Sequence, residues 1–528
     1  MRLLILLLFS FQVSVSFKIL IYNSKFGHSH SNFLGSVADI LVDAGHNVTS
    51  LIPVIDAHGK DGTVKSNKIY VDLGEKIQKA HDDSIGEHKM FFYTPYFDPI
   101  GTYMGGQAMA EMFESACRET LKNDELIERL REEKYDVMMA ESFDMCGMGL
   151  SHLIKPKSYI ALLSMSVFGP LYDEFGVPPA LSYQPSSYML NFDPHSMIDR
   201  VKNIVSESLI RGFFSPGRSK LEGLFREKYG HEFPGFKKLS SNVAYVFANN
   251  EPLLDFGGPT MSRVIPIGGL GAKAPKKLDE YWEKVMTTRS KVVLISFGSI
   301  APSESLADEK KEAILKTVAA YTSMTFIWKY ENPDDQFAIA AKKVHPNLIL
   351  SKWTPQNDLL NHPNMAAFIS HGGMGSCMEV AQRAVPALFI PLFGDQPKNA
   401  WAMEYHGLGK VISKFDLPYA DKLITNLREI IENKRYRENA KAISKKLTHK
   451  PFSSRELVIK YTEFAAEFGP SQALRPQSCD MSFIEYYNLD IIAVSVIITL
   501  FVVVFITHLV VMIFKRIFRK TSTKEKRS

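Results

Sequence analysis

Residues 365–379 read MAAFISHGGMGSCME, an apolar run followed at once by glycines. The run has the length and composition of a buried strand. Ligands of open parallel sheets bind beyond the carboxyl ends of the strands. Glycines there let backbone N–H groups approach an anion, a helix beginning near Gly375 points its positive end at that anion, and His371 can donate a further hydrogen bond. The stretch therefore predicts an α/β fold with a phosphate-type site at this strand end.

The same residues admit a purely structural interpretation. Ser376 and Glu379 fit the S-x-x-E capping box, which starts a helix without binding any ligand. On these residues alone both interpretations stay open. The sequence gives no support for a dinucleotide-binding protein, because neither predicted domain opens with G-x-G-x-x-G. It gives none for an esterase either, because the chain lacks G-x-S-x-G.

Short apolar strands alternate with helical patterns on both sides of this stretch. Such alternation is typical of parallel sheets, so we expect two doubly wound, Rossmann-like domains in tandem. Residues 159–236, rich in proline and aromatics, are expected to form loops and helices. The strands are expected at 17–24, 46–55, 135–141, 291–299, 325–330, 347–353, 365–371 and 386–393, and helices at 33–44, 124–134 and 307–321.

The two ends of the 528-residue chain carry apolar segments of different kinds. A basic start, a short apolar run and small residues up to Ser16 are typical of a secretory signal peptide. Residues 491–514 are apolar without a charged residue, which suits a membrane-spanning helix. The basic tail after it is expected in the cytosol, with the body luminal, and its Lys524 and Lys526 resemble a retrieval signal for the endoplasmic reticulum.

The sequence predicts a chain of several segments. These segments are a signal peptide 1–16, an acceptor-binding domain 17–261, a linker 262–290, a donor-binding domain 291–470, a juxtamembrane segment 471–490, a transmembrane helix 491–514 and a cytosolic tail 515–528.

Charge and cysteine content exclude some classes of protein. The net charge is +5, and residues 515–528 alone hold seven basic residues and one acid. The rest of the chain is thus close to neutral, so no nucleic-acid partner is expected. The four cysteines, Cys117, Cys146, Cys377 and Cys479, are too few and too scattered for a disulfide scaffold or a metal site. Asn47 begins a glycosylation sequon inside a predicted strand.

The stretch from Trp353 to Gln396 carries a closer resemblance. It reads WTPQNDLLNHPNMAAFISHGGMGSCMEVAQRAVPALFIPLFGDQ and closely resembles the signature of the UDP-glycosyltransferases, in particular the membrane-anchored UDP-glucuronosyltransferases of animals. ISFGS at 295–299, the signal peptide, the anchor and the basic tail also fit that branch. The resemblance implies the GT-B arrangement of two Rossmann-like domains, with a UDP-sugar bound by the second.

Carried over position by position, the resemblance implies a role for each donor-binding residue. Trp353 would stack on the uracil and Gln356 would read the uridine. Glu379 would accept hydrogen bonds from the ribose hydroxyls. Asp395 and Gln396 would hold the hydroxyls of the transferred sugar. The diphosphate would be held by His371, Gly373, Gly375 and Ser376, with Ser299 facing it from the other side.

The chain departs from the pattern at two positions. Many relatives have Asn where this chain has Gly375, and Gly where it has Ala384. The lost amide side chain weakens one phosphate contact, whereas the backbone N–H remains.

The acceptor half requires a base that removes the proton of a hydroxyl. Histidine suits this near neutral pH, and GHSHSNFLG at residues 27–35 follows the first strand. Relatives place the base fifteen residues before the glycine of the next G-H pair, here Gly45, which gives His30; His28 is the alternative. A carboxylate would orient the histidine. Relatives use an Asp five residues before a Cys, a position held here by Glu141, with Asp144 as the alternative.

The resulting expectation is an inverting transfer of a sugar to a small lipophilic hydroxyl acceptor, without metal and without a permanently bound cofactor. UDP-glucuronate is the expected donor and UDP-glucose the alternative. A membrane-anchored UDP-sugar binder without activity is a further alternative, motivated by Gly375 and Glu141. The sequence is compatible with a homo-oligomer and does not determine the oligomeric state.

Overall fold

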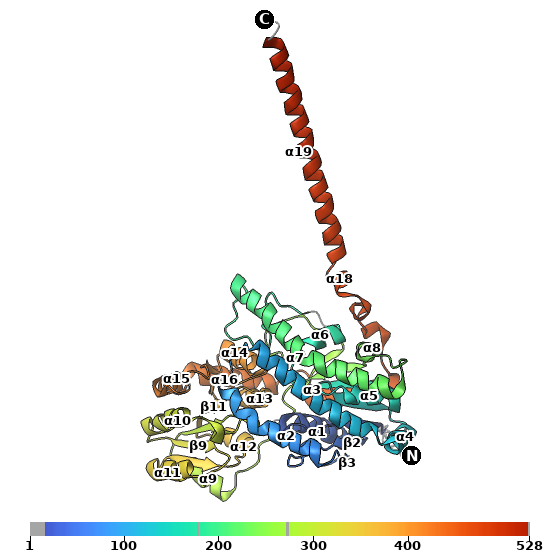
Figure 1. The fold of residues 1–528 in the computed structure, drawn as a ribbon. Coiled ribbons are helices and arrows are strands. Elements are labelled where there is room, and N and C mark those ends of the chain that lie inside the picture. The colour runs from blue at the N-terminus through green and yellow to red at the C-terminus, as the bar shows by residue number, and fades with distance from the viewer. Residues whose placement is uncertain (1–15, 177–178, 271–273, 526–528) are drawn as a thin grey trace, which may run out of the picture. The chain divides into compact units, whose positions relative to one another are not determined.

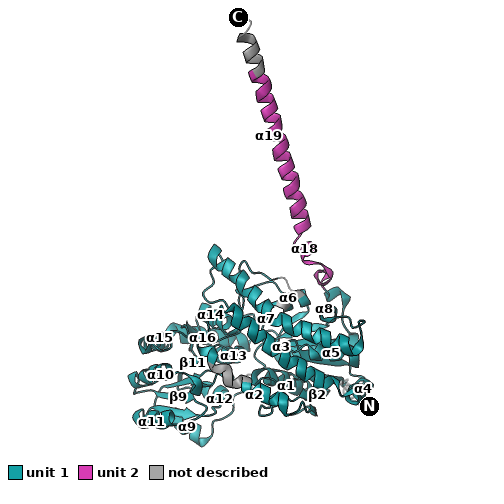
Figure 2. Ribbon diagram, viewed as in Figure 1, with its two compact units in different colours: residues 1–475 teal, residues 476–528 magenta. Residues whose placement is uncertain are grey.

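The computed structural model describes residues 16–176, 179–270 and 274–525, leaving aside the side chains of 84–89, 170, 173 and 519–525. The predicted signal peptide, apart from Ser16, lies outside the described residues, as does the end of the tail. The chain forms two compact units, residues 1–475 and residues 476–528 (Figure 2).

The first unit contains two parallel sheets, each flanked by helices (Figure 1). The first sheet has the strand order β3-β2-β1-β4-β5-β6-β7. Its strands are β1 Lys18–Tyr22, β2 Asn47–Pro53, β3 Asn67–Val71, β4 Val137–Glu141, β5 Ser158–Leu163, β6 Tyr245–Ala248 and β7 Val264–Pro266. All their pairings are parallel. Because both faces are covered, the central strands are almost wholly apolar.

The second sheet has the order β10-β9-β8-β11-β12-β13 and is also parallel throughout. Its strands are β8 Val292–Ser296, β9 Thr325–Lys329, β10 Leu348–Ser351, β11 Met365–Ser370, β12 Ala387–Phe389 and β13 Gly409–Val411. The predicted tandem of doubly wound domains is therefore confirmed.

Helices connect the strands of both sheets. The connections between strands of the first sheet contain α1 His28–Asp43, α2 Glu75–Gly86, η1 Glu87–Phe92, α3 Pro99–Leu121, α4 Asp124–Glu132, α5 Cys146–Ile154, α6 Pro170–Phe175, α7 Met197–Tyr229 and α8 Phe236–Ser241. The helices around the second sheet are α9 Glu280–Thr287, η2 Ser303–Ser305, α10 Asp308–Ala320, α11 Gln336–Val344, α12 Gln356–Leu360, α13 Met374–Arg383, α14 Gln396–Tyr405, α15 Ala420–Glu432 and α16 Lys434–Thr448. Helix α17, Ser454–Phe468, follows them.

Several sequence expectations differ from the structure. Region 159–236, expected to form loops and helices, also contains strand β5, and its helices include the 33-residue α7. The bounds of helix α7 were not predicted, because its first half buries polar side chains, Asn203, Ser206 and Glu207, and because Pro216 interrupts its pattern. Strand β7 extends the first sheet into the range expected as linker. Helix α17, within the range expected for the second domain, packs against the first sheet through Val458, Ala465 and Ala466.

A disulfide joins Cys117 of α3 to Cys146 at the start of α5. The sequence did not predict this bond, because the two cysteines are 29 residues apart and become neighbours only through the packing of the two helices. Cys377 and Cys479 are free and buried.

The second unit contains η4 Gln477–Asp480, the short helix α18 Phe483–Tyr486 and the long helix α19 Leu489–Glu525. Among the described residues, Leu489–Phe518 is the one stretch of helix long and apolar enough to cross a membrane. It contains the span expected from the sequence.

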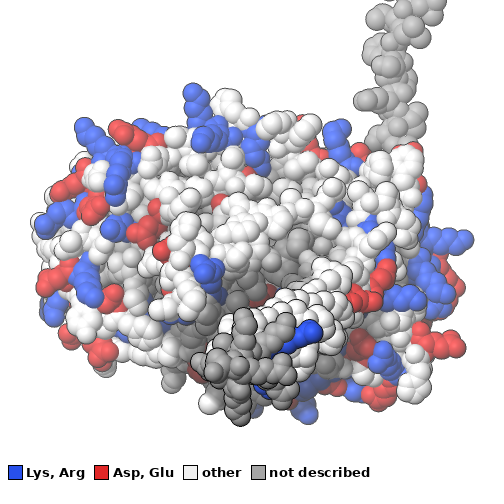
Figure 3. Space-filling view, turned by 90° about the horizontal axis from the view of Figure 1, so that it is seen from above, with Lys and Arg blue, Asp and Glu red and all other residues white. Residues whose placement is uncertain are grey.

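Surface charge is mixed on the face seen in Figure 3. Basic and acidic side chains lie beside one another around its rim, and uncharged residues occupy its centre. Among the described residues on this face, basic side chains form no continuous surface of the kind that binds nucleic acid.

Candidate functional site

Four of the candidate residues follow or end the strands at which each sheet reverses its strand order. In the first sheet, β1 and β4 are neighbours whose connections leave in opposite directions, and the same holds for β8 and β11 in the second. Crevices form beyond the carboxyl ends of such strands, and ligands bind there. His30 follows β1 and Glu141 ends β4, whereas Ser299 follows β8 and His371 follows β11.

His30 and Glu141 are in direct contact. Helix α1 begins at His28 with Gly27 as its N-cap, so His30 lies in the first turn of that helix. Its Nδ1 lies 3.2 Å from Oε2 of Glu141, and the side chains are 15% and 3% exposed respectively. The imidazole ring also packs against Phe26 and edge-on against Phe143. These contacts restrict the ring, and Nε2 is the nitrogen not engaged by Glu141.

The alternatives to these two residues have other partners. Asp144 is buried, where it accepts hydrogen bonds from the Tyr22 hydroxyl and the Cys146 backbone N–H. Burial raises the pKa of Asp144 to about 6. His28 packs edge-on against the indole of Trp353, at 5.8 Å between ring centroids, and burial lowers its pKa. The structure therefore brings His30, rather than His28, to Glu141.

The glycines around His371 make room for its imidazole. A Cβ on Gly373 would lie 2.5 Å from its Nε2, and one on Gly298, which has φ +88°, would lie 2.8 Å from the same atom. Two glycines from different strand ends thus enclose the ring, a packing that any side chain would prevent. Burial lowers the pKa of His371 to about 4, so the ring is neutral near pH 7 and acts as a hydrogen-bonding group.

The capping-box interpretation of Ser376 and Glu379 is wrong. Helix α13 begins at Met374 with Gly373 as its N-cap, and no side chain caps it. Glu379 instead accepts a hydrogen bond of 2.5 Å from Nε2 of Gln356, which also lies 3.3 Å from the Ser376 hydroxyl. The exposed N-terminus of α13 is thereby left available for an anion.

Gln356 and Glu379 form one polar cluster beside Trp353. Burial raises the pKa of Glu379 to about 7, and the hydrogen bond from Gln356 opposes the rise. The indole of Trp353 is 55% exposed, which is unusual for so large an apolar ring. The ammonium of Lys60 lies 5.4 Å from its centroid. The exposed ring is therefore available for stacking.

Asp395 and Gln396 follow β12 at the start of α14. Asp395 accepts a hydrogen bond from Asn399, and burial raises its pKa while the nearby His30 opposes that rise. Gln396 is buried, and its side-chain oxygen accepts from the backbone N–H groups of Leu392 and Phe393. The side-chain oxygen of Gln396 thus stabilises the loop between β12 and α14. Ser299 and Gly375 are exposed.

Two polar residues of the site were missed from the sequence. Lys329 ends β9, and its ammonium donates to the carbonyl of Gly298 and to Glu331. Ser164 follows β5, and its hydroxyl lies 2.7 Å from Nδ1 of His30. Lys329 is the last residue of its strand and Ser164 is the first residue after its own, and this position at a carboxyl end was the signal that could have found them.

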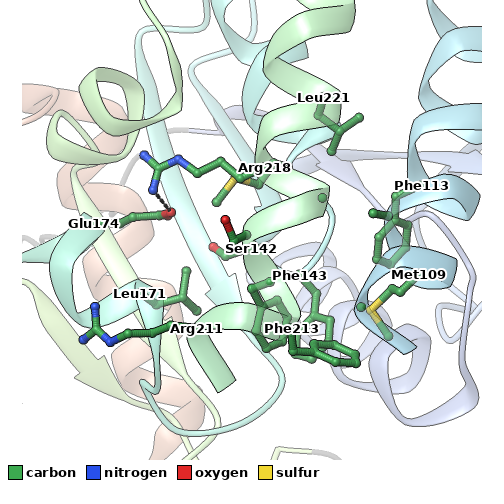
Figure 4. A pocket seen from close by; sticks show the side chains of 16 residues that line it. Met109, Phe113, Ser142, Phe143, Leu171, Glu174, Arg211, Phe213, Arg218 and Leu221 are labelled. Atoms are coloured by element: carbon green, nitrogen blue, oxygen red, sulfur yellow. Dashed lines mark hydrogen bonds and ion pairs between the residues drawn. The ribbon is translucent and has the colours of Figure 1, made fainter. Parts of the chain in front are cut away.

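A cavity of about 210 Å³ lies in the first domain between α3, α6 and α7 (Figure 4). Phe113 and Phe143 line it, and these two rings also contact Phe26, which packs on His30. At the polar end the Arg218 guanidinium pairs with Glu174 at 2.7 Å. The hydroxyl of Ser142, next to Glu141, is buried and has no hydrogen-bond partner among the described residues.

Comparison with known proteins identifies the family. Residues 17–527 match the family model described as UDP-glucuronosyl and UDP-glucosyl transferase. The chain belongs to the UDP-glycosyltransferase family. The family is enzymatic, so this UDP-glycosyltransferase is an enzyme.

The relatives cover nearly the whole chain. A putative UDP-glucuronosyltransferase of Caenorhabditis elegans, ugt-48, is 31% identical over 94% of this chain and 95% of its own length. UDP-glucuronosyltransferase 3A1 of Bos taurus is 29% identical over 90% of each chain. UDP-glucuronosyltransferase 1A1 of Rattus norvegicus is 28% identical over 91% of this chain and 88% of its own.

Solved glycosyltransferases share the fold. VinC, solved in complex with dTDP, superimposes with a TM-score of 0.56 at 16% identity, covering 85% of this chain and 99% of that one. A glycosyltransferase of kitacinnamycin gives 0.55 at 16% identity, covering 86% and 99%. The predicted GT-B architecture is therefore confirmed.

Proposed function

We propose that this UDP-glycosyltransferase transfers a sugar from a UDP donor to a hydroxyl of a small lipophilic acceptor, with inversion at the anomeric carbon. Glucuronate is the proposed sugar, because the relatives named above are called UDP-glucuronosyltransferases. The observation that carries the proposal is the contact between His30 and Glu141, at the switch point of the first sheet. A base held by a carboxylate is what a hydroxyl nucleophile requires.

The second domain supplies the donor half of the proposed site. The uracil stacks on the exposed indole of Trp353, beside Gln356, and Glu379 accepts from the ribose hydroxyls. The diphosphate lies at the N-terminus of α13, against the backbone of Gly373 and Gly375, the Ser376 hydroxyl and neutral His371. Charge that develops on the departing diphosphate is stabilised by these fixed donors.

The first domain supplies the acceptor half. The acceptor occupies the cavity that Phe143 lines (Figure 4). Its hydroxyl is presented to His30, which packs against Phe143. The acceptor oxygen attacks the anomeric carbon as its proton passes to Nε2 of His30. The bond from that carbon to the diphosphate breaks, and its electron pair leaves with UDP. Glu141 stabilises the imidazolium, and the product is a β-glycoside.

The proposed location is the endoplasmic reticulum membrane, with both α/β domains luminal and the segment after residue 514 cytosolic. The apolar helix Leu489–Phe518 supports an anchor of this kind. The basic residues that follow it support the orientation.

Acceptor-dependent release of UDP tests the proposal. Membranes containing the full chain are incubated with phenols and lipophilic alcohols, with UDP-glucuronate and UDP-glucose run in parallel. The proposal predicts turnover with UDP-glucuronate, and the mass of the product reports which sugar was transferred. Turnover with UDP-glucose alone would reverse the assignment of the donor. UDP binding without turnover across the panel would favour a binder without activity.

A further inference from the structure

Ser164 contacts both members of the His30–Glu141 pair. Its hydroxyl oxygen lies 2.7 Å from Nδ1 of His30, whereas the carboxylate oxygen of Glu141 lies 3.2 Å from that nitrogen. Its backbone N–H donates to Oε1 of Glu141 at 3.2 Å, while the other carboxylate oxygen faces the imidazole. One residue thus holds the base and the carboxylate at the same time.

The direction of these hydrogen bonds follows from the chemistry of the partners. An ionised carboxylate only accepts, so Nδ1 of His30 must carry a proton where it faces Glu141. The same N–H then points at the hydroxyl of Ser164, which accepts it, and the bond is shared between the two acceptors. With the proton held on Nδ1, the lone pair of the neutral ring is on Nε2. Glu141 therefore selects the tautomer that a base needs, and the hydroxyl of Ser164, which can accept the same N–H, holds the ring in that orientation.

The backbone of Ser164 is fixed on its other side. The side-chain amide of Asn249 donates to the Ser164 carbonyl at 2.9 Å, and its oxygen accepts from the N–H of Gly269 at 3.3 Å. Asn249 directly follows β6, the neighbour of β5. Ser164 is thus held between two strand ends, and the position of its hydroxyl is set by the sheet.

We infer that Ser164 is a positioning residue, which orients His30 in the tautomer that Glu141 selects. The inference rests on the proposed function, in which His30 is the base. It assigns no contact between Ser164 and the substrates. Loss of the hydroxyl should therefore slow proton removal and leave the donor site as it is.

The test compares Ser164→Ala with Ser164→Thr, which keeps a hydroxyl, and with Ser158→Ala. Ser158 is a matched control, because it is a buried serine at the opposite end of the same strand. Loss of a single hydrogen bond of this kind should lower kcat by about 3- to 10-fold in the alanine variant. The threonine variant should recover most of that loss, the KM for the donor should stay within about 2-fold of wild type, and the control should equal wild type.

The dependence of the kcat loss on the acidity of the acceptor distinguishes a positioning role from a merely structural one. Acidic phenols are already largely ionised, so they depend little on a base. The inference predicts that the loss in Ser164→Ala shrinks as the phenol becomes more acidic. An equal loss along the series, or a rise in donor KM alone, would overturn it.

The structure of the variant separates failure of this inference from failure of the proposed function. If wild type transfers no sugar to any acceptor, the proposed function fails. The Ser164→Ala structure then still decides the positioning role, because the inference predicts an imidazole in more than one orientation. An unchanged His30 ring would contradict it.

Discussion

The ammonium of Lys414 donates hydrogen bonds to the carbonyl of Phe91, from the first domain, and to that of Leu392, from the second. Lys310 likewise donates to the carbonyl of Phe92. The side chain of Phe92 is wholly buried in the core of the second sheet. The segment between α2 and α3 thus fastens one domain to the other, next to the loop that carries Asp395.

Removal of the buried ring should weaken this connection. Phe92→Ala leaves a cavity in the second core, and we expect a loss of about 3–5 kcal/mol in the free energy of unfolding. Thermal unfolding of the solubilised full chain measures it. Phe415→Ala, which truncates a ring 45% exposed, serves as the control and should change little. Equal midpoints for the two variants would contradict this account of the domain junction.

Donor binding should depend on pH through Glu379. Burial raises the pKa of this carboxyl to about 7, so the ionised form that accepts from ribose hydroxyls is lost as the pH falls below 7. We expect the donor KM to rise roughly 5- to 10-fold between pH 8 and pH 6. The same shift means that the fold binds this proton more tightly than the unfolded chain, so the contribution of Glu379 to stability decreases as the pH rises through 4.5 to 7.

The variant Glu379→Gln separates this effect from the titration of other groups. It cannot ionise, so its donor KM should be higher than that of wild type at pH 8 and should vary little with pH. A wild-type KM that stays flat from pH 6 to pH 8 would show that the carboxyl is ionised throughout.

Two neighbouring glycines should respond differently to a methyl group. Gly373→Ala would bring a Cβ to 2.5 Å from Nε2 of His371, whereas at Gly375 no atom lies within 4 Å of the added carbon. We expect donor affinity to fall at least about 10-fold in Gly373→Ala, because the imidazole must leave its place, and far less in Gly375→Ala. Titration with UDP measures both. Similar affinities for the two variants would mean that His371 does not need that space.

Loss of the disulfide should destabilise the wall of the cavity. The bond joins α3, which lines the cavity, to the helix that follows Met145, another lining residue. Replacement of both Cys117 and Cys146 by serine should cost about 2–4 kcal/mol in unfolding free energy. Chemical denaturation with and without reductant measures this cost in wild type, and the double variant should show no effect of reductant. A reductant-insensitive wild type would contradict the assigned pairing.

The sequence predicted those features that depend on neighbouring residues. The strand Met365–Ser370 and the glycines after it form a local pattern, and the structure has the predicted strand. The pairing of Cys117 with Cys146 and the contact of Phe92 with the second core depend on packing between distant segments, which no local pattern records. Ser164 was missed for the same reason, since its partner His30 is 134 residues away.

Family resemblance supplied what local chemistry could not. The choice of His30 over His28 came from a counted spacing to Gly45, and the structure brings His30 to Glu141. The capping-box alternative failed because α13 starts one turn earlier than Ser376 and Glu379 would require. The resemblance implied that Gln396 holds a sugar hydroxyl, whereas in the structure its side-chain oxygen accepts from the backbone of its own loop.

The central claim, that His30 is the base of a sugar transfer, is tested most directly by acceptor-dependent UDP release from matched membranes of wild type, His30→Ala and His28→Ala. The account predicts release by wild type, a fall of at least about 100-fold in His30→Ala, as the loss of a general base requires, and substantial release by His28→Ala. Full release by His30→Ala, or loss in His28→Ala alone, would contradict it.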